Sequence, residues 1–129
     1  MSSAPPEPAI HVLLVEDHAM LRGLLERTLT AEGFRVTVAE TGDDAAALIE
    51  AGAMPNIMLS DLRMPGKLNG LDLARWLKQR NPSIAILLMT AFANVHTGEF
   101  QVLSKPFDPA MLVTAIREGV SSAGKGASS

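Results

Sequence analysis

Short, almost continuous apolar runs alternate along this chain with segments of helical periodicity. Residues 10–15 and 84–89 are the two clearest runs. A strand reads as uninterrupted apolar sequence when both of its faces are buried, as in parallel sheets covered by helices. The alternation therefore predicts a doubly wound α/β fold. We expect its five parallel strands at residues 10–15, 34–39, 56–60, 84–89 and 101–104.

Helix start and stop signals fall between these strands. Apolar residues recur at helical spacing from Met20, and Gly33 is a typical helix end. Thr41 and Asn69 are predicted N-cap residues of the next two helices. Asp108, followed by a proline at the first helical position, predicts the start of the last helix.

Length and composition indicate one domain with short tails. The chain has 129 residues, enough for a single hydrophobic core. Residues 1–9 contain three prolines and residues 121–129 are small and polar, so we expect flexible tails there and a domain over residues 10–120. With no cysteine, the chain lacks disulfides, thiolate metal ligands and cysteine nucleophiles.

Charge and hydropathy bear on the partners and the location. The 11 basic and 14 acidic residues give a net charge of −3, so we expect no nucleic-acid partner. No apolar run reaches the roughly 18–20 residues of a membrane span, and residues 1–9 do not resemble a signal peptide. We expect a cytoplasmic protein without a membrane partner.

Polar residues with complementary chemistry follow the predicted strands. Glu16 and Asp17 follow the first, Asp61 the third, Thr90 the fourth and Lys105 the fifth. Parallel strands bring such residues to one edge of the sheet, where ligands bind. Clustered carboxylates repel one another unless a cation is present, and their hard oxygens suit Mg²⁺. One such residue alone is usually a helix cap or a loop residue, but the coincidence at successive strand ends favours a site.

The motifs that carry these residues resemble a known family. They are Leu14-Val-Glu-Asp-His18, Leu59-Ser-Asp-Leu-Arg-Met-Pro-Gly66, Met89-Thr-Ala91 and Ser104-Lys-Pro-Phe107. Together, over residues 10–120, they resemble the receiver domain of two-component response regulators. The resemblance implies a flavodoxin-like strand order of 2-1-3-4-5.

The resemblance also implies a role for each site residue. Asp61 matches the phosphoacceptor, Thr90 the hydroxyl that binds the phosphoryl group, and Lys105 the lysine that pairs with either of them. Asp17 matches the direct Mg²⁺ ligand and Glu16 its acidic neighbour, while Arg63 offers its backbone carbonyl to the metal. The family holds the bond between Lys105 and the following proline in the cis form.

The implied function is signalling rather than turnover of a separate substrate. Asp61 would receive a phosphoryl group from a histidine kinase or a histidine phosphotransfer protein, with Mg²⁺ as cofactor. We expect a monomeric single-domain regulator that acts through phosphorelay or phosphorylation-dependent protein binding. A receiver cut from a hybrid histidine kinase is an alternative. A Mg²⁺-dependent phosphohydrolase with an aspartyl-phosphate intermediate is another, although Arg63 stands where such enzymes carry a second aspartate.

The chain departs from the family between the fourth and fifth strands. Thr90 and Lys105 are fifteen positions apart, which is several residues fewer than is typical, so we expect a fourth helix that is shortened or absent. Val102 occupies the usual position of the aromatic switch residue. We expect His18, next to the acidic pair, at the rim of the site.

Overall fold

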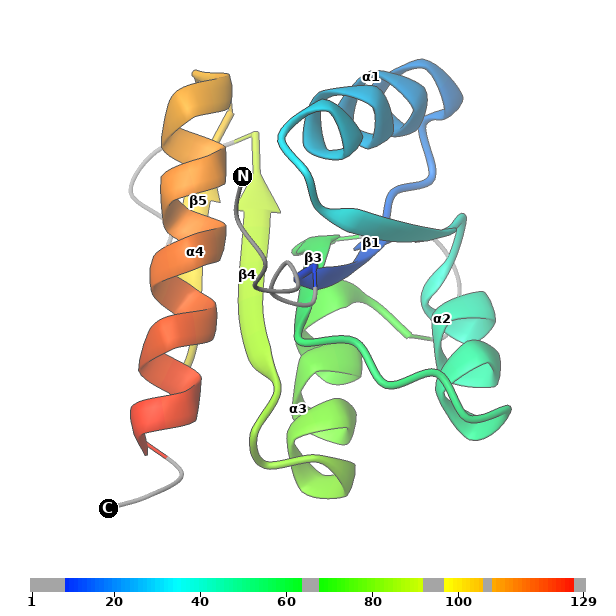
Figure 1. Cartoon of the computed structure of the whole chain (residues 1–129). Helices are drawn as coiled ribbons and strands as arrows, with labels where there is room; N and C mark the ends of the chain where they lie inside the picture. Colours follow the sequence, from blue (N-terminus) through cyan, green and yellow to red (C-terminus); the bar gives the residue numbers. More distant parts are fainter. Residues whose placement is uncertain (1–8, 64–67, 92–96, 106–107, 127–129) are drawn as a thin grey trace.

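Five parallel strands form one sheet in the order β2-β1-β3-β4-β5 (Figure 1). A computed structural model describes residues 9–63, 68–91, 97–105 and 108–126. The strands are β1 (His11–Val15), β2 (Arg35–Ala39), β3 (Ile57–Asp61), β4 (Ala85–Thr90) and β5 (Gln101–Ser104). The expected fold and strand order are thereby confirmed, and each strand lies within one residue of its predicted start.

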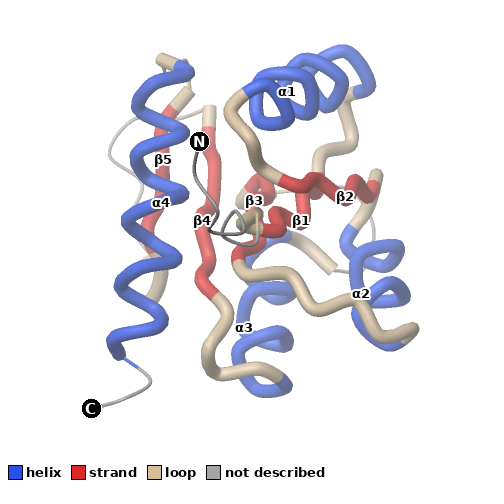
Figure 2. Tube along the Cα trace, viewed as in Figure 1, coloured by secondary structure: helices blue, strands red, loops and turns tan. Residues whose placement is uncertain are grey.

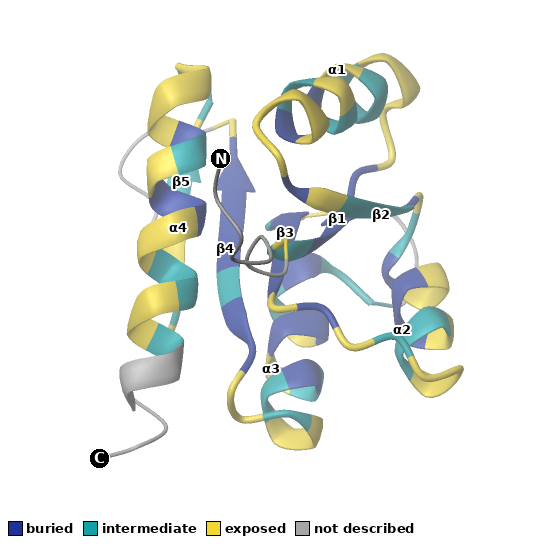
Figure 3. Ribbon diagram, viewed as in Figure 1, coloured by how far each residue is buried: buried dark blue, intermediate teal, exposed yellow. Residues whose placement is uncertain are grey.

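Two helices cover each face of the sheet (Figure 2). Helices α1 (Ala19–Ala31) and α4 (Pro109–Gly126) pack on one face, and α2 (Gly42–Glu50) and α3 (Gly70–Arg80) pack on the other. The central strand β1 shows how both cores are filled. Val12 and Leu14 point toward α1 and α4, whereas Leu13 and Val15 point toward α2 and α3. Burial on both faces explains the unbroken apolar run (Figure 3).

The predicted helix signals act as expected. The Thr41 Oγ1 atom accepts a hydrogen bond from the Asp44 N–H at 3.0 Å, and Asn69 Oδ1 accepts one from the Asp72 N–H at 2.9 Å. After α1 the chain passes through Gly33 with a φ of 94°, a conformation that favours glycine. These local contacts set where the helices begin and end.

The C-terminal helix corrects the tail expected from residue 121, because α4 continues to Gly126. Val120 and Ala123 are partly buried against the core, and this packing carries the helix through residues with weak intrinsic helix preference. The tail expected at residues 1–9 falls, except for its last residue, outside the described residues.

The connection between β4 and β5 is only partly described. Ala91 and residues 97–100 contain no helix, while residues 92–96, on which the prediction of a short or absent fourth helix depends, lie outside the described residues. In the described ranges, no helix is long and apolar enough to span a membrane.

Candidate functional site

The carboxyl ends of the strands bring the predicted site residues around one cavity. Asp61 and Thr90 are the last residues of β3 and β4, and Lys105 directly follows β5. The cavity has a volume of about 520 Å³. Its lining includes all six residues predicted from the sequence, namely Glu16, Asp17, Asp61, Arg63, Thr90 and Lys105.

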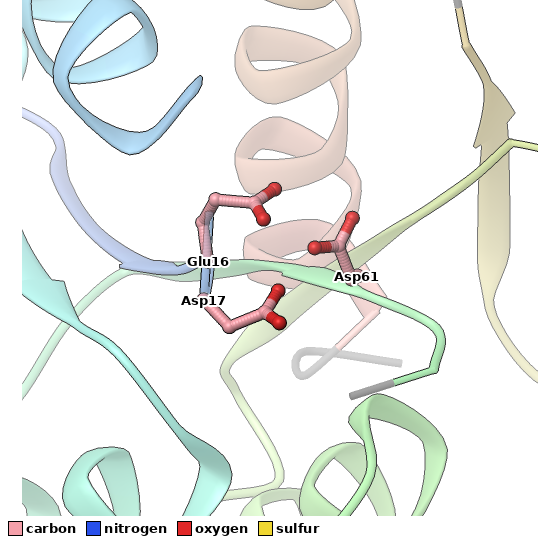
Figure 4. Close-up of side chains that lie close together, drawn as sticks. All are labelled: Glu16, Asp17 and Asp61. Carbon is pink, nitrogen blue, oxygen red and sulfur yellow. The ribbon is translucent and has the colours of Figure 1, made fainter. Parts of the chain in front are cut away.

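Three carboxylates converge in this cavity (Figure 4). One oxygen from each of Glu16, Asp17 and Asp61 lies within 4.8 Å of the other two. Glu16 and Asp61 are buried, whereas Asp17 is exposed. Three carboxylates at this separation repel one another, so the arrangement is suited to a hard cation with oxygen ligands.

Lys105 supplies a positive charge to two of these carboxylates. Its Nζ atom lies 2.7 Å from Asp61 Oδ1 and 3.4 Å from Glu16 Oε1. Its backbone N–H also donates to the Thr90 carbonyl at 2.6 Å, which fixes the start of the Lys105 side chain beside β4. Partial burial on its own lowers the pKa of Lys105, but the hydrogen bond to Asp61 and the two carboxylate charges outweigh it and raise the pKa. The lysine therefore stays protonated.

For Glu16 the largest effect on the pKa is burial, which removes its charge from water. Burial raises the pKa of Glu16 above the ordinary glutamate value, and the hydrogen bond and charge of Asp61 raise it further. The His18 N–H donates to Glu16 Oε2 at 3.1 Å, and this contact together with the Lys105 charge lowers the pKa in part. The ionised carboxylate is thus held at an electrostatic disadvantage that a bound cation would relieve.

Comparison with known proteins identifies the family. The family model for the response regulator receiver domain matches residues 12–117. The chain belongs to this family.

Two curated relatives show how this receiver compares with longer proteins. The DNA-binding transcriptional regulator NtrC of Salmonella typhimurium is 35% identical over 117 residues, covering 85% of this chain and 24% of NtrC. The alkaline phosphatase synthesis transcriptional regulatory protein SphR of Synechococcus elongatus is 32% identical over 134 residues, covering 91% of this chain and 52% of SphR. The receiver therefore spans about a quarter to a half of these relatives.

Solved structures of similar size have the same fold. A CheY-like response regulator receiver domain protein from Methanospirillum hungatei has a TM-score of 0.82 at 23% identity, covering 92% of this chain and 99% of that one. A response regulator receiver protein from Sinorhizobium medicae has a TM-score of 0.79 at 28% identity, covering 89% and 97%.

A glycine allows the end of β3 in this receiver to lie against the start of α3. A Cβ atom added at Gly70, the first residue of α3, would collide with the Asp61 carbonyl oxygen. The Gly70 N–H also donates to the Leu62 carbonyl at 3.0 Å, and the Leu62 N–H donates to the Met89 carbonyl at 2.7 Å. The turn after Asp61 is therefore packed backbone against backbone.

Two features of the receiver's first loop were not predicted from the sequence. His18 lines the cavity, as expected, but it is also the N-cap of α1, because its Nδ1 atom accepts from the Leu21 N–H at 3.3 Å. Arg22 donates to the Glu16 carbonyl at 3.0 Å and lies 3.4 Å from Glu40. The sequence signal that could have indicated the Arg22 contact is its position, one turn into the helix that follows the acidic pair.

The remaining expectations concern residues near the site. Arg63 is exposed at the cavity, and the role of its backbone carbonyl stays a prediction. The proline after Lys105 lies outside the described residues, and so does the predicted cis bond. Val102 is half-buried on the face of β5 that points toward α3, so a valine side chain occupies the position expected for an aromatic switch.

Proposed function

We propose that Asp61 accepts a phosphoryl group from the phosphohistidine of a histidine kinase or a histidine phosphotransfer protein. The observation that carries this proposal is the position of Asp61. It lies 2.7 Å from the Lys105 ammonium group and has an oxygen within 4.8 Å of oxygens of two further carboxylates. A carboxylate between a lysine and a potential cation site has the surroundings of an aspartyl nucleophile.

The donor set fits Mg²⁺. Glu16, Asp17 and Asp61 each offer a carboxylate oxygen, and the backbone carbonyl of Arg63 is a fourth candidate ligand. Mg²⁺ prefers such oxygen ligands and keeps part of its water shell. When bound, Mg²⁺ would neutralise charge on the phosphoryl oxygens. Because Asp17 lines the cavity and is exposed, a phosphoryl group can approach from the solvent side.

The chain's own residues divide the work of transfer. An Asp61 oxygen attacks the phosphorus atom, the bond between phosphorus and the donor's imidazole nitrogen breaks, and its electron pair returns to the imidazole. Lys105 orients the acceptor carboxylate before the attack and balances phosphoryl charge afterwards. Thr90 is buried and lines the cavity, which supports a role for its hydroxyl in hydrogen-bonding a phosphoryl oxygen.

We infer a signalling role rather than the turnover of a separate substrate. Slow hydrolysis would return the carboxylate, and the phosphorylated receiver would act through phosphorelay or through binding a protein partner. We propose that it acts in the cytoplasm as a monomer, without direct contact to nucleic acid. Because NtrC and SphR are transcriptional regulators longer than this chain, a receiver that works as part of a longer regulator or of a hybrid kinase is the alternative arrangement.

The proposal is tested by phosphorylating the full chain with acetyl phosphate and Mg²⁺. We expect one hydroxylamine-sensitive phosphate per chain in the wild type, and none in Asp61→Asn. Asp72→Asn is the matched control, because it removes the same charge at an exposed helix position and should label normally. Equal labelling of Asp61→Asn would contradict the proposal. Repeated turnover of a phosphate ester would favour the phosphohydrolase alternative.

A further inference from the structure

The exposed ligand Asp17 owes its orientation to the backbone around it. Within the described ranges, its carboxylate has no hydrogen-bonding or ion-pairing partner, yet one of its oxygens lies within 4.8 Å of oxygens of Glu16 and Asp61. The direction of the side chain is then set by the loop that joins β1 to α1. What holds this loop therefore determines whether the three carboxylates converge.

Contacts on both sides of Asp17 hold the loop. The Glu16 N–H donates to the Ala39 carbonyl at 3.0 Å and thereby joins the loop to the end of β2. The His18 N–H donates to the Glu16 carboxylate at 3.1 Å. Neither contact engages the carbonyl of the peptide group between Glu16 and Asp17. The orientation of this peptide group directs the Asp17 side chain.

Arg22 engages the carbonyl of that peptide. Its Nη1 atom donates to the Glu16 carbonyl oxygen at 3.0 Å, and its Nη2 atom lies 3.4 Å from Glu40 Oε1. The Arg22 side chain is only 18% exposed, whereas Glu40 is 68% exposed. The contact to the carbonyl is therefore the sheltered one, and the ion pair with Glu40 lies in solvent, where such pairs contribute little.

The charge of Arg22 has to be distinguished from its hydrogen bond, because a positive charge near a cation site opposes cation binding. Lys105 faces Glu16 and Asp61 from β5, while Arg22 approaches the acidic pair from α1. A guanidinium group stays charged at any pH at which a protein is folded and presents several donors in a fixed plane. It can hold a backbone carbonyl, and a gain in cation binding must come from this hydrogen bond rather than from the charge.

We propose that Arg22 is a positioning residue for the metal site, holding the peptide between Glu16 and Asp17 so that Asp17 faces Glu16 and Asp61. The proposal rests on the proposed function, because it assigns Arg22 to the cation site of the same cavity. Arg22 touches neither the acceptor nor the phosphoryl group, so it acts only through the loop. Its loss weakens cation binding and leaves the acceptor chemistry intact once the cation is bound.

The test compares single substitutions in the full chain, with Mg²⁺ alone as the ligand. Isothermal titration gives the dissociation constant for Mg²⁺, and acetyl phosphate at saturating Mg²⁺ gives the maximal labelling rate. For Arg22→Gln we expect a dissociation constant raised about 10-fold, the usual effect of losing a group that orients a metal ligand. The maximal labelling rate should stay within about twofold of the wild type, since excess Mg²⁺ compensates for weaker binding.

Two matched controls separate this role from general charge effects. Arg27→Gln removes the same charge from an exposed position of the same helix, and Glu40→Gln removes only the ion-pair partner. Both should bind Mg²⁺ within about twofold of the wild type, as expected for solvent-exposed charges. An unchanged dissociation constant in Arg22→Gln, or an equal loss in Arg27→Gln or Glu40→Gln, would overturn the proposal.

Folding and the parent proposal are checked separately. If thermal melting shows that Arg22→Gln does not fold, Arg22→Lys takes its place, since it keeps the charge but lacks the planar set of donors. We expect Arg22→Lys to bind Mg²⁺ about threefold more weakly than the wild type. If Arg22→Lys keeps the wild-type affinity, the proposal is overturned. If the wild type is labelled and binds Mg²⁺, and Arg22→Gln binds Mg²⁺ equally well, only the role of Arg22 is refuted. A wild type that does neither refutes the proposed function as well.

Discussion

Lys105 reaches Asp61 across an intervening strand. The two side chains meet at 2.7 Å, although Asp61 ends β3 and Lys105 follows β5, and β4 lies between these strands in the sheet. The Lys105 backbone N–H is tied to the carbonyl of Thr90, the residue that ends β4. The Lys105 ammonium group, the Thr90 hydroxyl and the Asp61 carboxylate therefore come from three neighbouring strand ends, and a displacement of one strand would move its group relative to the other two.

Removing the lysine should destabilise the fold through the carboxylates it leaves behind. Lys105→Met leaves Asp61 and Glu16 close together without their shared cation, so we expect the free energy of unfolding to fall by about 1–2 kcal/mol. Urea denaturation at pH 7 without divalent cations measures the change. In an Asp61→Asn background the same substitution should cost less, and equal losses in both backgrounds would contradict a direct pair.

Neutralising Glu16 should have the opposite effect in the metal-free protein. Burial and Asp61 raise the pKa of Glu16 in the folded state, so ionisation of Glu16 disfavours the fold. Stability is therefore lost as the pH rises from the pKa in the unfolded state through the pKa in the folded state. We expect Glu16→Gln to melt at a higher temperature than the wild type at pH 7, with the gap closing near pH 4. Adding Mg²⁺ should stabilise the wild type more than the variant. A gap that does not change with pH would count against this account.

His11 predicts a loss of stability on mild acidification. Its imidazole Nε2 lies 2.7 Å from Thr37 Oγ1, and burial together with the nearby Arg35 charge lowers the pKa of His11 below 6.5. A histidine whose pKa is lowered by folding contributes stability at pH values above its pKa in the unfolded state. This contribution is lost as the pH falls through the pKa in the folded state. Urea titrations between pH 8 and 5 should therefore show a flatter profile for His11→Gln. At pH 8 the imidazole is neutral in both the folded and the unfolded state, so the difference between the wild type and His11→Gln there reports only the change in packing. Parallel pH profiles for the two proteins would refute the prediction.

A pair of glycine substitutions separates close backbone approach from helix preference. Gly70→Ala places a methyl group against the Asp61 carbonyl, and we expect a loss of about 2–3 kcal/mol in the free energy of unfolding. In Gly23→Ala the nearest atom to the new methyl is the end of the Arg27 side chain at 3.8 Å, so alanine should stabilise α1 by about 0.5–1 kcal/mol. Chemical denaturation distinguishes the two signs, and a neutral Gly70→Ala would show that the turn after Asp61 can relax.

The fold was largely predictable because its signals are local. Burial on both faces makes strands such as β4 continuous apolar runs, and side-chain caps such as those of Thr41 and Asn69 act within three residues. The end of α4 was not predictable in this way. Its last turns have a small, polar and glycine-containing sequence, and packing of Val120 and Ala123 on the core carries the helix across it.

The site was predictable only in part, for a related reason. Parallel strands bring residues at their carboxyl ends together, so Glu16, Asp61 and Lys105 could be assigned to one cavity from their positions after strands. Arg22 acts through a backbone carbonyl, and any residue can present a carbonyl. The position of Arg22 one turn into α1 indicates that it lies near the loop, but no residue type in the loop marks the carbonyl as its partner, so the contact itself is visible only in the structure.

The ion pair between Lys105 and Glu16 joins residues 89 positions apart, nearly the whole length of the receiver. During translation the acidic pair is made directly after the first strand, and the lysine follows only after all five strands have been made. A nascent chain therefore carries its carboxylates without their cation until β5 joins the sheet, a contact between distant segments that forms late. The lysine and the carboxylates can therefore meet only after the whole sheet of this domain has been made.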